Sequence, residues 1–598
     1  MGGLPFALFP ISRISGEGKP RAQTDNRNRI ASTPWREFER KGTKMSLSRR
    51  QFLAGAATIG GTAAIGGLLS GCQPQQQSDQ NSADGNSQYP DGTTAEDFQN
   101  SVVELAPISD FAEEKTFDIV VIGAGTAGVP AVCTALEEGA TVACLQKETV
   151  VIAHGNGSSG PILEESTALG TLQYKQAWRA AGGYRMNPDL LDLYVNHAGE
   201  TIMWMMRKGE EAGLPPQASK ARTDFDEGSW ITVASNYFGP KPINNQDIMT
   251  RLAEKAAAAG AEFFYETPAV QLVQADDGSV TGVIGKTKDG YIKFNAAKAV
   301  IVAAGDYQNN ESLVARYSPD VVRFQRKQSN MTADGILMSM AVGARMVPVN
   351  HAKTMHDMDA GPMALTSLPF MALNELGERF MNEDIPMESW DLSLQWNKDA
   401  EDPGRFFRIF DNNFMEKYGA TVTIEQLENY IPGLKENPEG VYEGLIDTHR
   451  ADTLDELAEA LGIPADALKK SVDAWNDYCA KGADEQFGLS RNKLKPIDTP
   501  PYWGIRQWIR CSAINAGVVV DGCCRVLGKD DKPIPGLYSV GSGAGNVCGG
   551  LEWNLYQGGL CCGSYMTMGR YAAIHALTGE FTPSQPATYE SAKDGWNA

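Results

Sequence analysis

Three glycines at fixed spacing are the first residues in this chain whose arrangement points to chemistry. Gly123, Gly125 and Gly128 form the pattern G-x-G-x-x-G within residues 116–148, TFDIVVIGAGTAGVPAVCTALEEGATVACLQKE. Glycine at these places allows a tight turn, a close approach of backbone to a pyrophosphate, and close packing of a helix on a strand. The pattern predicts a dinucleotide-binding turn; the alternative is a glycine-rich turn without a ligand.

The elements around the glycines must form one strand-helix-strand unit. Phe117–Ile122 is a β-branched run suited to a buried parallel strand, and the helix after it would direct its free N–H groups at the phosphates. Thr141–Leu145 is the expected second strand. An acid that holds the adenosine ribose usually follows such a strand. Gln146 stands there instead, and its amide can also hydrogen-bond a ribose hydroxyl.

Periodicity extends this pattern towards the middle of the chain. Residues 187–213 and 246–260 are expected to be helices, and two Asp-Gly turns separate β-branched runs beyond them. The expected strands are 263–267, 269–275, 280–286, 291–295 and 300–303. The alternation of strands and helices predicts an α/β fold.

The first 72 residues carry signals for export rather than for folding. SRRQFL at residues 48–53 matches a twin-arginine signal, and the apolar stretch 54–69 after it is too rich in glycine for a permanent membrane span. Cys72 ends a Leu-Ser-Gly-Cys run that resembles a lipoprotein processing site. The alternative is a chance arginine pair before a buried helix. Because such signals lie at chain starts, Met45 is the expected first residue, with residues 1–44 untranslated.

Residues 73–115 are expected to be a flexible tether, because their first part is polar and low in complexity. With a lipid on Cys72, the body would be anchored on the outer face of the cytoplasmic membrane, in the cell envelope or periplasm. The formal net charge of −21 argues against nucleic acid as a partner. It would suit a basic electron-transfer partner, although a solvated acidic surface needs no partner at all.

Neither the histidines nor the cysteines have the spacing of a metal site. Only two of the six histidines, His351 and His356, lie close together, and the ten cysteines lack C-x-x-C spacings. We interpret the C-terminal cysteines as small buried apolar residues; disulfides and an iron–sulfur cluster are the alternatives. These cysteines are Cys511, Cys523, Cys524, Cys548, Cys561 and Cys562.

Several longer stretches together resemble one flavoprotein family. They are the glycine motif, NHAGETIMWMMRKG, DGSVTGV, AKAVIVAAGDYQNNESLVARYSP, TADGILMSMAVGA, NELGERFMNED and GLYSVGSGAGNVCGG. Over about residues 116–575 the chain is similar to fumarate reductases, succinate dehydrogenases and 3-ketosteroid dehydrogenases. The resemblance implies a Rossmann-like FAD domain built from 116–349 and 496–598, with an inserted α+β capping domain at 350–495. Substrate would lie between the flavin and the cap.

The resemblance also implies which residues hold FAD. The expected cofactor-binding residues are Gly123, Gly125, Thr126, Ala127, Gly128, Gln146, Lys147, His154, Gly155, Asn156, Gly157, Ser158, Gly160, Ala304, Gly305, Asp334, Gly541, Gly558 and Gly559. FAD is expected to bind without a covalent bond, as in most relatives. A covalent link at His154 is the alternative, because succinate dehydrogenases carry FAD on a histidine six residues before a glycine.

The chain departs from the family where a dicarboxylate would bind. Fumarate reductases use a histidine pair before a glycine pair and an arginine in an N-R-L-G-G run. Here residues 512–517 read SAINAG and residues 554–559 read NLYQGG. The arginine that donates the proton also has no counterpart, since DNNFMEK offers only Lys417. Two desolvated carboxylates need cationic partners, so fumarate and succinate are not expected to be substrates.

Three residues are candidates for catalysis. Glu383 could relay protons, or it could be a structural carboxylate tied to Arg379. The Tyr556 stretch is similar to one in ketosteroid enzymes where a tyrosine hydroxyl and a backbone N–H, here near Gly559, hold a ketone oxygen; the alternative is an aromatic ring packed on the flavin. His356 lies where the family places a substrate-side histidine, and a surface or core histidine is the alternative.

The main hypothesis is an FAD-dependent reductase that adds hydride from flavin N5 to an activated C=C bond. The substrate would be an enone or enoate of an apolar or aromatic molecule, and the electrons would come from a membrane or cytochrome donor. A second hypothesis is a ketosteroid-type dehydrogenase that runs in the oxidative direction. A third is a lipoprotein that binds flavin or another ligand without catalysis.

Overall fold

The computed structural model describes residues 89–588, apart from 156, 215, 239–242, 356–359, 386–388, 398, 399, 401, 437, 439 and 550–557. The predicted export signal, Cys72 and the first part of the tether therefore lie outside the described residues. Within the described part, no helix combines the length and the apolar character needed to cross a membrane.

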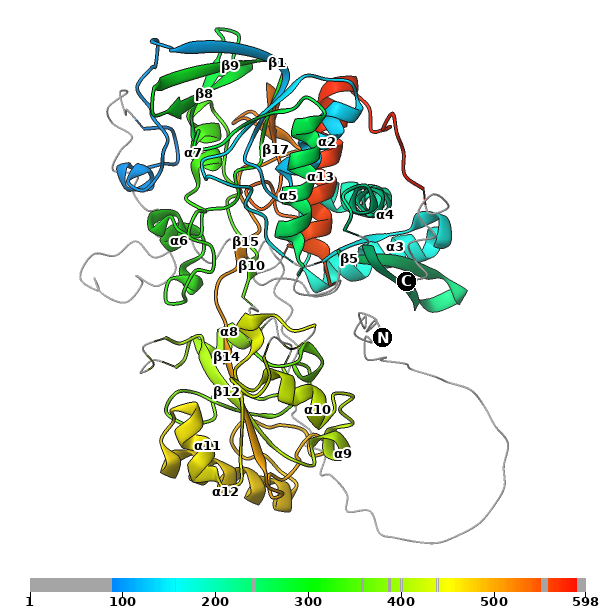
Figure 1. Cartoon of the computed structure of the whole chain (residues 1–598), viewed down its shortest axis with the longest axis vertical. Coiled ribbons are helices and arrows are strands. Elements are labelled where there is room, and N and C mark those ends of the chain that lie inside the picture. The colour runs from blue at the N-terminus through cyan, green and yellow to red at the C-terminus, as the bar shows by residue number, and fades with distance from the viewer. Residues whose placement is uncertain are drawn as a thin grey trace, which may run out of the picture. The chain divides into compact units, whose positions relative to one another are not determined.

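A mixed sheet forms the centre of the larger domain (Figure 1). Its strand order is β16 (Arg525–Leu527), β17 (Pro533–Ser539), β9 (Gly290–Val302), β1 (Glu113–Ile122), β2 (Val142–Leu145) and β6 (Glu262–Phe264). The strands from β17 to β6 are parallel, and β16 is an antiparallel edge strand. The sheet joins residues from both ends of the chain, as the family resemblance predicts.

The sequence predicted most of these strands, but it divided one of them. β7 (Ala269–Gln274) and β8 (Val280–Thr287) form an antiparallel extension beside β9. The two expected strands at 291–295 and 300–303 are the single strand β9. Its first part pairs with both β8 and β1, and its last part pairs with β1 and β17, so hydrogen bonds continue through residues 296–299.

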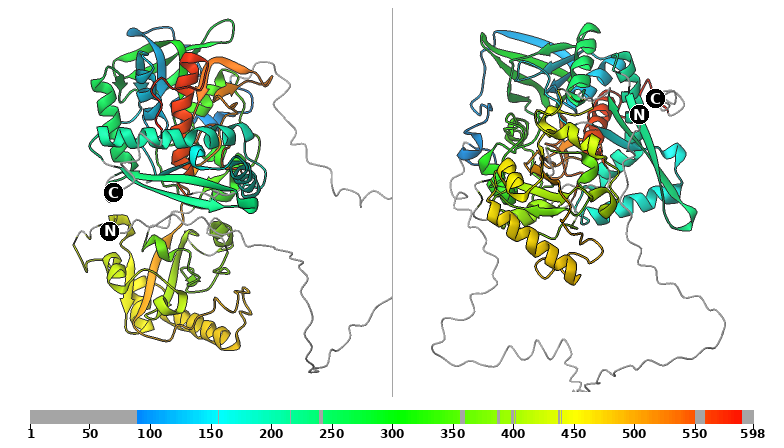
Figure 2. Two further views of the ribbon diagram at one scale, coloured as in Figure 1. Left: turned by 90° about the vertical axis from the view of Figure 1, so that its right-hand side faces the viewer. Right: turned by 60° about the horizontal axis from the view of Figure 1, so that its bottom comes forward.

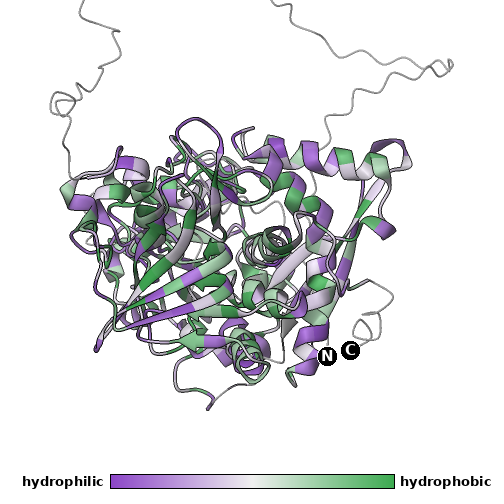
Figure 3. Ribbon diagram, turned by 90° about the horizontal axis from the view of Figure 1, so that it is seen from above, coloured by the Kyte–Doolittle hydropathy of each residue, from purple (hydrophilic) through white to green (hydrophobic). Residues whose placement is uncertain are grey.

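The helices α2 (Gly128–Glu137) and α13 (Leu560–Thr578) lie against this sheet. Outside them, α4 (Pro188–Glu211) packs on α13, and α5 (Asn245–Ala258) packs on α2. α13 packs against α2 and α4, so the last helix of the described residues lies beside the one that follows the glycine turn (Figure 1). Figure 3 shows apolar residues on the inner elements and polar residues on the outward faces of the helices.

A second, three-stranded sheet has the order β3 (Ser158–Pro161), β5 (Trp230–Phe238) and β4 (Pro216–Asp224). This sheet is not evident from the sequence pattern. The remaining α-helices of the described part are α3 (Ala168–Ala181), α6 (Glu311–Tyr317), α7 (Asp334–Ala341), α8 (Trp390–Leu394), α9 (Phe414–Tyr418), α10 (Ile424–Leu427), α11 (Leu454–Leu461) and α12 (Ala465–Lys481).

The predicted tether is too long at its C-terminal end, because the chain contacts the body well before residue 115. Asp97 is fully buried and forms an ion pair with Arg316 at 3.1 Å. The Glu104 backbone N–H donates to the Val270 carbonyl at 2.9 Å, so the segment adds to the edge of the sheet. These contacts fix residues that the composition of the tether had suggested to be free.

The inserted capping domain has its own sheet and core. The strand order is β11 (Met371–Leu373), β12 (Arg405–Asp411), β14 (Tyr502–Trp508) and β13 (Thr448–Ala451), and α11 and α12 share a hydrophobic cluster with it. The predicted boundary at residue 495 is wrong, because β14 hydrogen-bonds to β12 and β13. The cap therefore ends after residue 508.

The two chain segments that link the FAD domain to the cap are paired with each other. β10 (Lys353–Thr354) and β15 (Ala513–Ile514) form a short antiparallel ladder. Figure 2 shows the FAD domain and the cap from two further directions. This pairing brings the departure point and the return point of the inserted domain together.

Candidate active site

The glycine turn has a geometry that only glycine allows at its first and third positions. Gly123 has φ +102°, and a Cβ there would lie 2.5 Å from the Ala303 carbonyl oxygen. A Cβ on Gly128 would lie 1.9 Å from the Gly123 carbonyl oxygen. Ala127 precedes α2 and offers no side-chain cap, so the first N–H groups of this helix suit a phosphate.

The loop after β2 is fixed next to this turn. The Asn245 amide donates to the His154 carbonyl at 2.7 Å and to the Thr126 hydroxyl at 3.0 Å. Within the described part, His154 Nε2 and Ser158 Oγ are buried without a hydrogen-bond partner. Burial, assisted by the charge of Lys327, lowers the pKa of His154 to about 4, so its ring is neutral at pH 7. Buried polar atoms without partners are expected where a polar cofactor completes the site.

On the predicted ribose side of the site, Gln146, Lys147 and Asp334 each have a protein partner. The Gln146 amide nitrogen donates to the Val150 carbonyl at 3.0 Å, which leaves its second N–H and its carbonyl oxygen to meet a ribose. Lys147 forms an ion pair with Asp334 at 2.9 Å. Asp334 also accepts from the Ser101 hydroxyl at 2.8 Å. Lys147 and Asp334, two predicted FAD residues, therefore bind each other, and Asp334 also binds the N-terminal segment.

The C-terminal glycines bring α13 to the same loop. Gly559 has φ +79°, and its carbonyl accepts from the Ser159 N–H at 3.2 Å. A Cβ on Gly563 would lie 2.1 Å from the Ser159 carbonyl oxygen. The N-cap of α13 is Gly559 itself, without a side-chain cap. The start of α13 therefore packs directly on β3, and no side chain caps it.

Other predicted glycines also lie at close approaches. A Cβ on Gly155 would meet Cys562 Sγ at 2.2 Å, and one on Gly160 would lie 2.4 Å from the Ala198 backbone. Gly305 and Gly541 have φ +79° and +82°. Asn156, His356 and Tyr556 lie outside the described residues, so their predicted roles stay predictions.

Glu383 lies in a buried ion-pair cluster inside the cap. Arg379 donates to Glu383 Oε1 at 2.9 Å and Oε2 at 2.6 Å, and it also forms an ion pair with Asp484 at 3.0 Å. Burial raises the pKa of Glu383, against the opposing effect of Arg379. Burial also opposes ionisation of Asp484, but hydrogen bonds from Arg379 and from backbone N–H groups lower its pKa to about 2. This geometry matches the structural alternative for Glu383.

A polar cluster that the sequence analysis missed lies beneath β15. Asp306 is 1% exposed and accepts from the backbone N–H groups of Gln308 at 2.9 Å and Ile514 at 3.1 Å. Burial raises the pKa of Asp306 to about 6, although these hydrogen bonds lower it. Tyr565 donates to the Asn515 amide oxygen. Asp306 follows the apolar run at the carboxyl end of β9. Ligands of parallel sheets bind at this end of the strands, so the position of Asp306 in the sequence could have indicated a role in the site.

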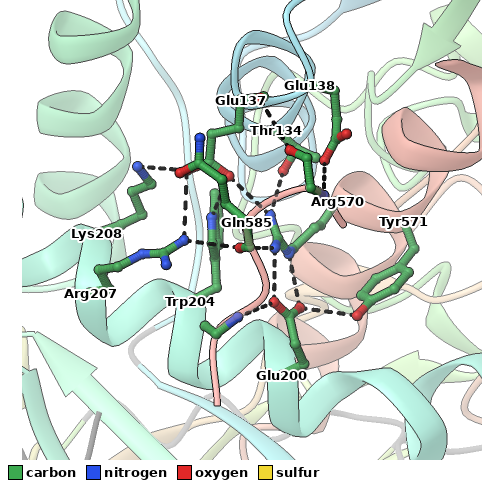
Figure 4. A network of polar contacts seen from close by, with 12 residues as sticks. Thr134, Glu137, Glu138, Glu200, Trp204, Arg207, Lys208, Arg570, Tyr571 and Gln585 are labelled. Carbon is green, nitrogen blue, oxygen red and sulfur yellow. Dashed lines mark hydrogen bonds and ion pairs between the residues drawn. The ribbon is translucent and has the colours of Figure 1, made fainter. Parts of the chain in front are cut away.

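The C-terminal half of α13 is fixed by the polar network of Figure 4. The Arg570 side chain is fully buried, donates twice to Glu200 at 2.8 and 2.9 Å, and contacts Glu137 at 3.2 Å. Glu200 also accepts from the Tyr571 hydroxyl at 3.0 Å. The network therefore joins α2, α4 and α13. It lies at the C-terminal end of α2, whereas the glycine turn lies at the N-terminal end of that helix.

Comparison with known proteins gives the family. The model of the family described as "FAD binding domain" matches residues 118–559. The chain is 26% identical to vinyl phenol reductase of Lactiplantibacillus plantarum over 504 residues, covering 78% of this chain and 97% of that protein. It is 24% identical to digoxin reductase of Eggerthella lenta, covering 86% of this chain and 95% of that protein.

Two solved structures share the fold. One is the open conformation of a flavocytochrome c3 fumarate reductase, with a TM-score of 0.61, 22% identity and coverage of 78% of each chain. The other is 3-ketosteroid delta1-dehydrogenase from Sterolibacterium denitrificans, with a TM-score of 0.58, 20% identity and coverage of 78% of this chain and 100% of that chain. The glycine turn, the uncapped helix starts and the unpartnered His154 and Ser158 fit a bound flavin nucleotide. The chain belongs to the FAD binding domain family, and it is an FAD-dependent oxidoreductase.

Proposed function

We propose that this protein reduces an activated C=C bond, in an enone or enoate of an apolar or aromatic molecule. The observation that carries the proposal is the composition of the return strand from the cap. Residues 512–515 offer a hydroxyl, a methyl group, an apolar side chain and an amide where fumarate reductases place histidines. The Asn515 amide donates to Thr354 at 2.8 Å and accepts from Tyr565, so this position has no cation for a carboxylate.

The named relatives support reduction of a C=C bond. Vinyl phenol reductase and digoxin reductase both match over at least 95% of their own length. Urocanate reductase of Eggerthella lenta matches over 70% of its length at 27% identity. These names describe reductases of three different molecules, and we infer that this chain acts on a C=C bond of a further one.

Bound FAD would supply the hydride, and the residues of this chain would bind and orient the substrate. Reduction of a C=C bond next to a carbonyl puts negative charge on the carbonyl oxygen. Tyr556 and a backbone N–H near Gly559 are the proposed donors to that oxygen. Glu383, or a tyrosine close to the site, would supply the proton; the Arg379 ion pair gives Glu383 a structural role as well.

We also propose the place of the reaction and the source of its electrons. The twin-arginine motif and the Cys72 site support export and lipid anchoring on the outer face of the cytoplasmic membrane. Nicotinamide cofactors are scarce there, so a membrane or cytochrome donor would supply the electrons. A flavocytochrome is among the proteins with a similar fold. Labelling with a radioactive fatty acid, with Cys72→Ser as the control, tests the anchor.

The activity is tested with the purified flavoprotein and a reduced viologen as electron donor. Apolar and aromatic enones and enoates should be reduced, whereas fumarate should not. Tyr556→Phe should lower kcat/KM at least tenfold at unchanged flavin content, since one donor to a charged oxygen contributes about 2.7–4 kcal/mol. Tyr184→Phe, at a tyrosine that is 72% exposed, is the control.

Two results would refute the proposal. One is reduction of fumarate at a kcat/KM equal to that of the best enone. The other is oxidation of saturated ketones with an artificial acceptor in the absence of any reduction, which would favour the dehydrogenase hypothesis.

A further inference from the structure

Residues 97–104, which we call the strap, precede β1 and are fastened to the FAD domain at both ends. The first residue, Asp97, is fully buried and accepts two hydrogen bonds from Arg316, both at 3.1 Å. The last residue, Glu104, forms an ion pair with Lys286 at 2.8 Å. Figure 1 shows this N-terminal segment, drawn in blue, beside α6. The strap is therefore part of the folded domain, although it lies next to the predicted tether.

The middle of the strap meets a single carboxylate. The Ser101 hydroxyl donates to Asp334 Oδ1 at 2.8 Å, and the Val102 N–H donates to the same oxygen at 3.2 Å. The other oxygen, Oδ2, accepts from Lys147 at 2.9 Å and from the Thr332 hydroxyl at 2.8 Å. Asp334 is only 6% exposed, so these four donors take the place of water. The carboxylate joins the strap to the residues that follow β2.

This carboxylate lies at the nucleotide end of the domain. Asp334 begins α7, and the N–H of Ala333 before it donates to the Asp306 carbonyl at 3.2 Å. Lys147 directly follows Gln146, the residue predicted to meet the ribose. Nucleotides bind at the carboxyl ends of parallel strands, and β1, β2 and β9 end side by side here. The strap therefore meets the domain beside the position predicted for the ribose of FAD.

We propose that the strap holds FAD in its site, with Ser101 and Val102 as positioning residues that act through Asp334 and Lys147. The two strap donors fix the Asp334 carboxylate, which fixes the Lys147 ammonium and with it the chain at Gln146. FAD dissociates when the strap lifts, so the contacts at the ends of the strap slow dissociation together with the central one. By reciprocity, bound FAD holds the strap in place. The proposal depends on the binding of FAD and not on the substrate or the direction of the reaction.

A single substitution in the purified flavoprotein tests the central contact. Ser101→Ala removes the hydroxyl that donates to Asp334. The rate at which flavin fluorescence appears after dilution should rise about tenfold, as expected for the loss of one hydrogen bond to a charged group. Ser279→Ala is the matched control, because it removes a serine hydroxyl that donates to Asp277 at 2.6 Å in the hairpin outside the strap. Its rate of FAD release should equal that of the wild type.

A substitution at the far end tests whether the strap acts as one unit. The Asp97 side chain binds Arg316 of α6 rather than Asp334 or Lys147. A purely local role of Asp97 would leave FAD release unchanged in Asp97→Asn, whereas a strap that lifts as a whole should release FAD faster. In the double variant with Ser101→Ala the two effects should be less than multiplicative, because both variants loosen the same segment.

Proteolysis gives a measurement on the strap itself. A glutamyl protease should cut after Glu104 more slowly at saturating FAD than without FAD. At saturating FAD it should cut there faster in Ser101→Ala than in the wild type. Cleavage after Glu485 of the cap, whose side chain is 65% exposed, should be equal in these two proteins. Mass spectrometry identifies both sites.

Three results would overturn the proposal. The first is release of FAD at the same rate from Ser101→Ala and Ser279→Ala. The second is release from Asp97→Asn at the rate of the wild type. The third is cleavage after Glu104 at a rate that does not depend on FAD.

Discussion

Replacing Arg570 by glutamine tests how far the polar network of Figure 4 stabilises the FAD domain. The Arg570 side chain is 0% exposed, and its removal leaves the partly buried Glu200 without its main cation, while Glu137 loses one cation and keeps Lys208 at 2.7 Å. Breaking a buried ion pair from one side costs about 3–5 kcal/mol. About 500 folded residues at about 2.1 cal/mol/K each give an unfolding entropy of about 1 kcal/mol/K. Arg570→Gln should therefore lower the Tm by about 3–5 °C.

A matched control comes from the same network. Arg207 contacts Glu137 at 3.9 Å and Glu211 at 4.0 Å, and its side chain is 32% exposed. Such a pair contributes about 0–1 kcal/mol, so Arg207→Gln should lower the Tm by about 1 °C or less. Scanning calorimetry and the release of flavin fluorescence measure both variants. Equal shifts in the two variants, or a shift below about 1 °C for Arg570→Gln, would refute the reasoning.

Three further predictions concern the site and the cap. Gly128→Ala should abolish FAD binding, measured by flavin absorbance, because the new Cβ would lie 1.9 Å from the Gly123 carbonyl; Gly444→Ala, which meets nothing within 4 Å, should bind normally. Glu383→Gln should lower the Tm of the cap by several degrees, since it breaks a buried pair, and a kcat within twofold of the wild type would remove Glu383 from the proton path. The pKa of Asp306 is about 6 in the folded protein, against 3.8 for a free aspartate. The folded state therefore loses about 3 kcal/mol of stability as the pH rises from about 4 to 6, and Asp306 causes no further loss above that pH. Asp306→Asn should remove that part of the pH dependence of the Tm, and an identical pH profile would contradict it.

The sequence predicted those parts of the fold that depend on local pattern. The strand, glycine turn and helix around Gly123 follow from β-branched residues and from glycine spacing, and the hairpin near residue 277 follows from its Asp-Gly turn. β4 was missed because QASKARTD lacks apolar alternation; it is held by pairing with β5. The cap boundary was misplaced because β14 finds its partners about 50 and 95 residues earlier in the chain.

The site was predictable as a set of segments but not as a set of contacts. Glycines with positive φ could be named, because their type restricts what the backbone can do there. The partners of charged residues could not be named. Lys147 meets Asp334 across 187 positions, and Asp306 meets Ile514 across 208. Such pairs depend on how the sheet is assembled, which no local pattern contains.

The position of β17 and α13 in the sheet and the helix layer sets the order in which the molecule can be completed during synthesis. A ribosome-bound chain that ends before residue 533 has β9 without its partner β17, and α2 without the helix that covers it. The cap, which is continuous from about residue 350 to 508, has all its strands by then. The FAD domain can close only after α13 has left the ribosome, so stable loading with flavin must follow synthesis of that helix.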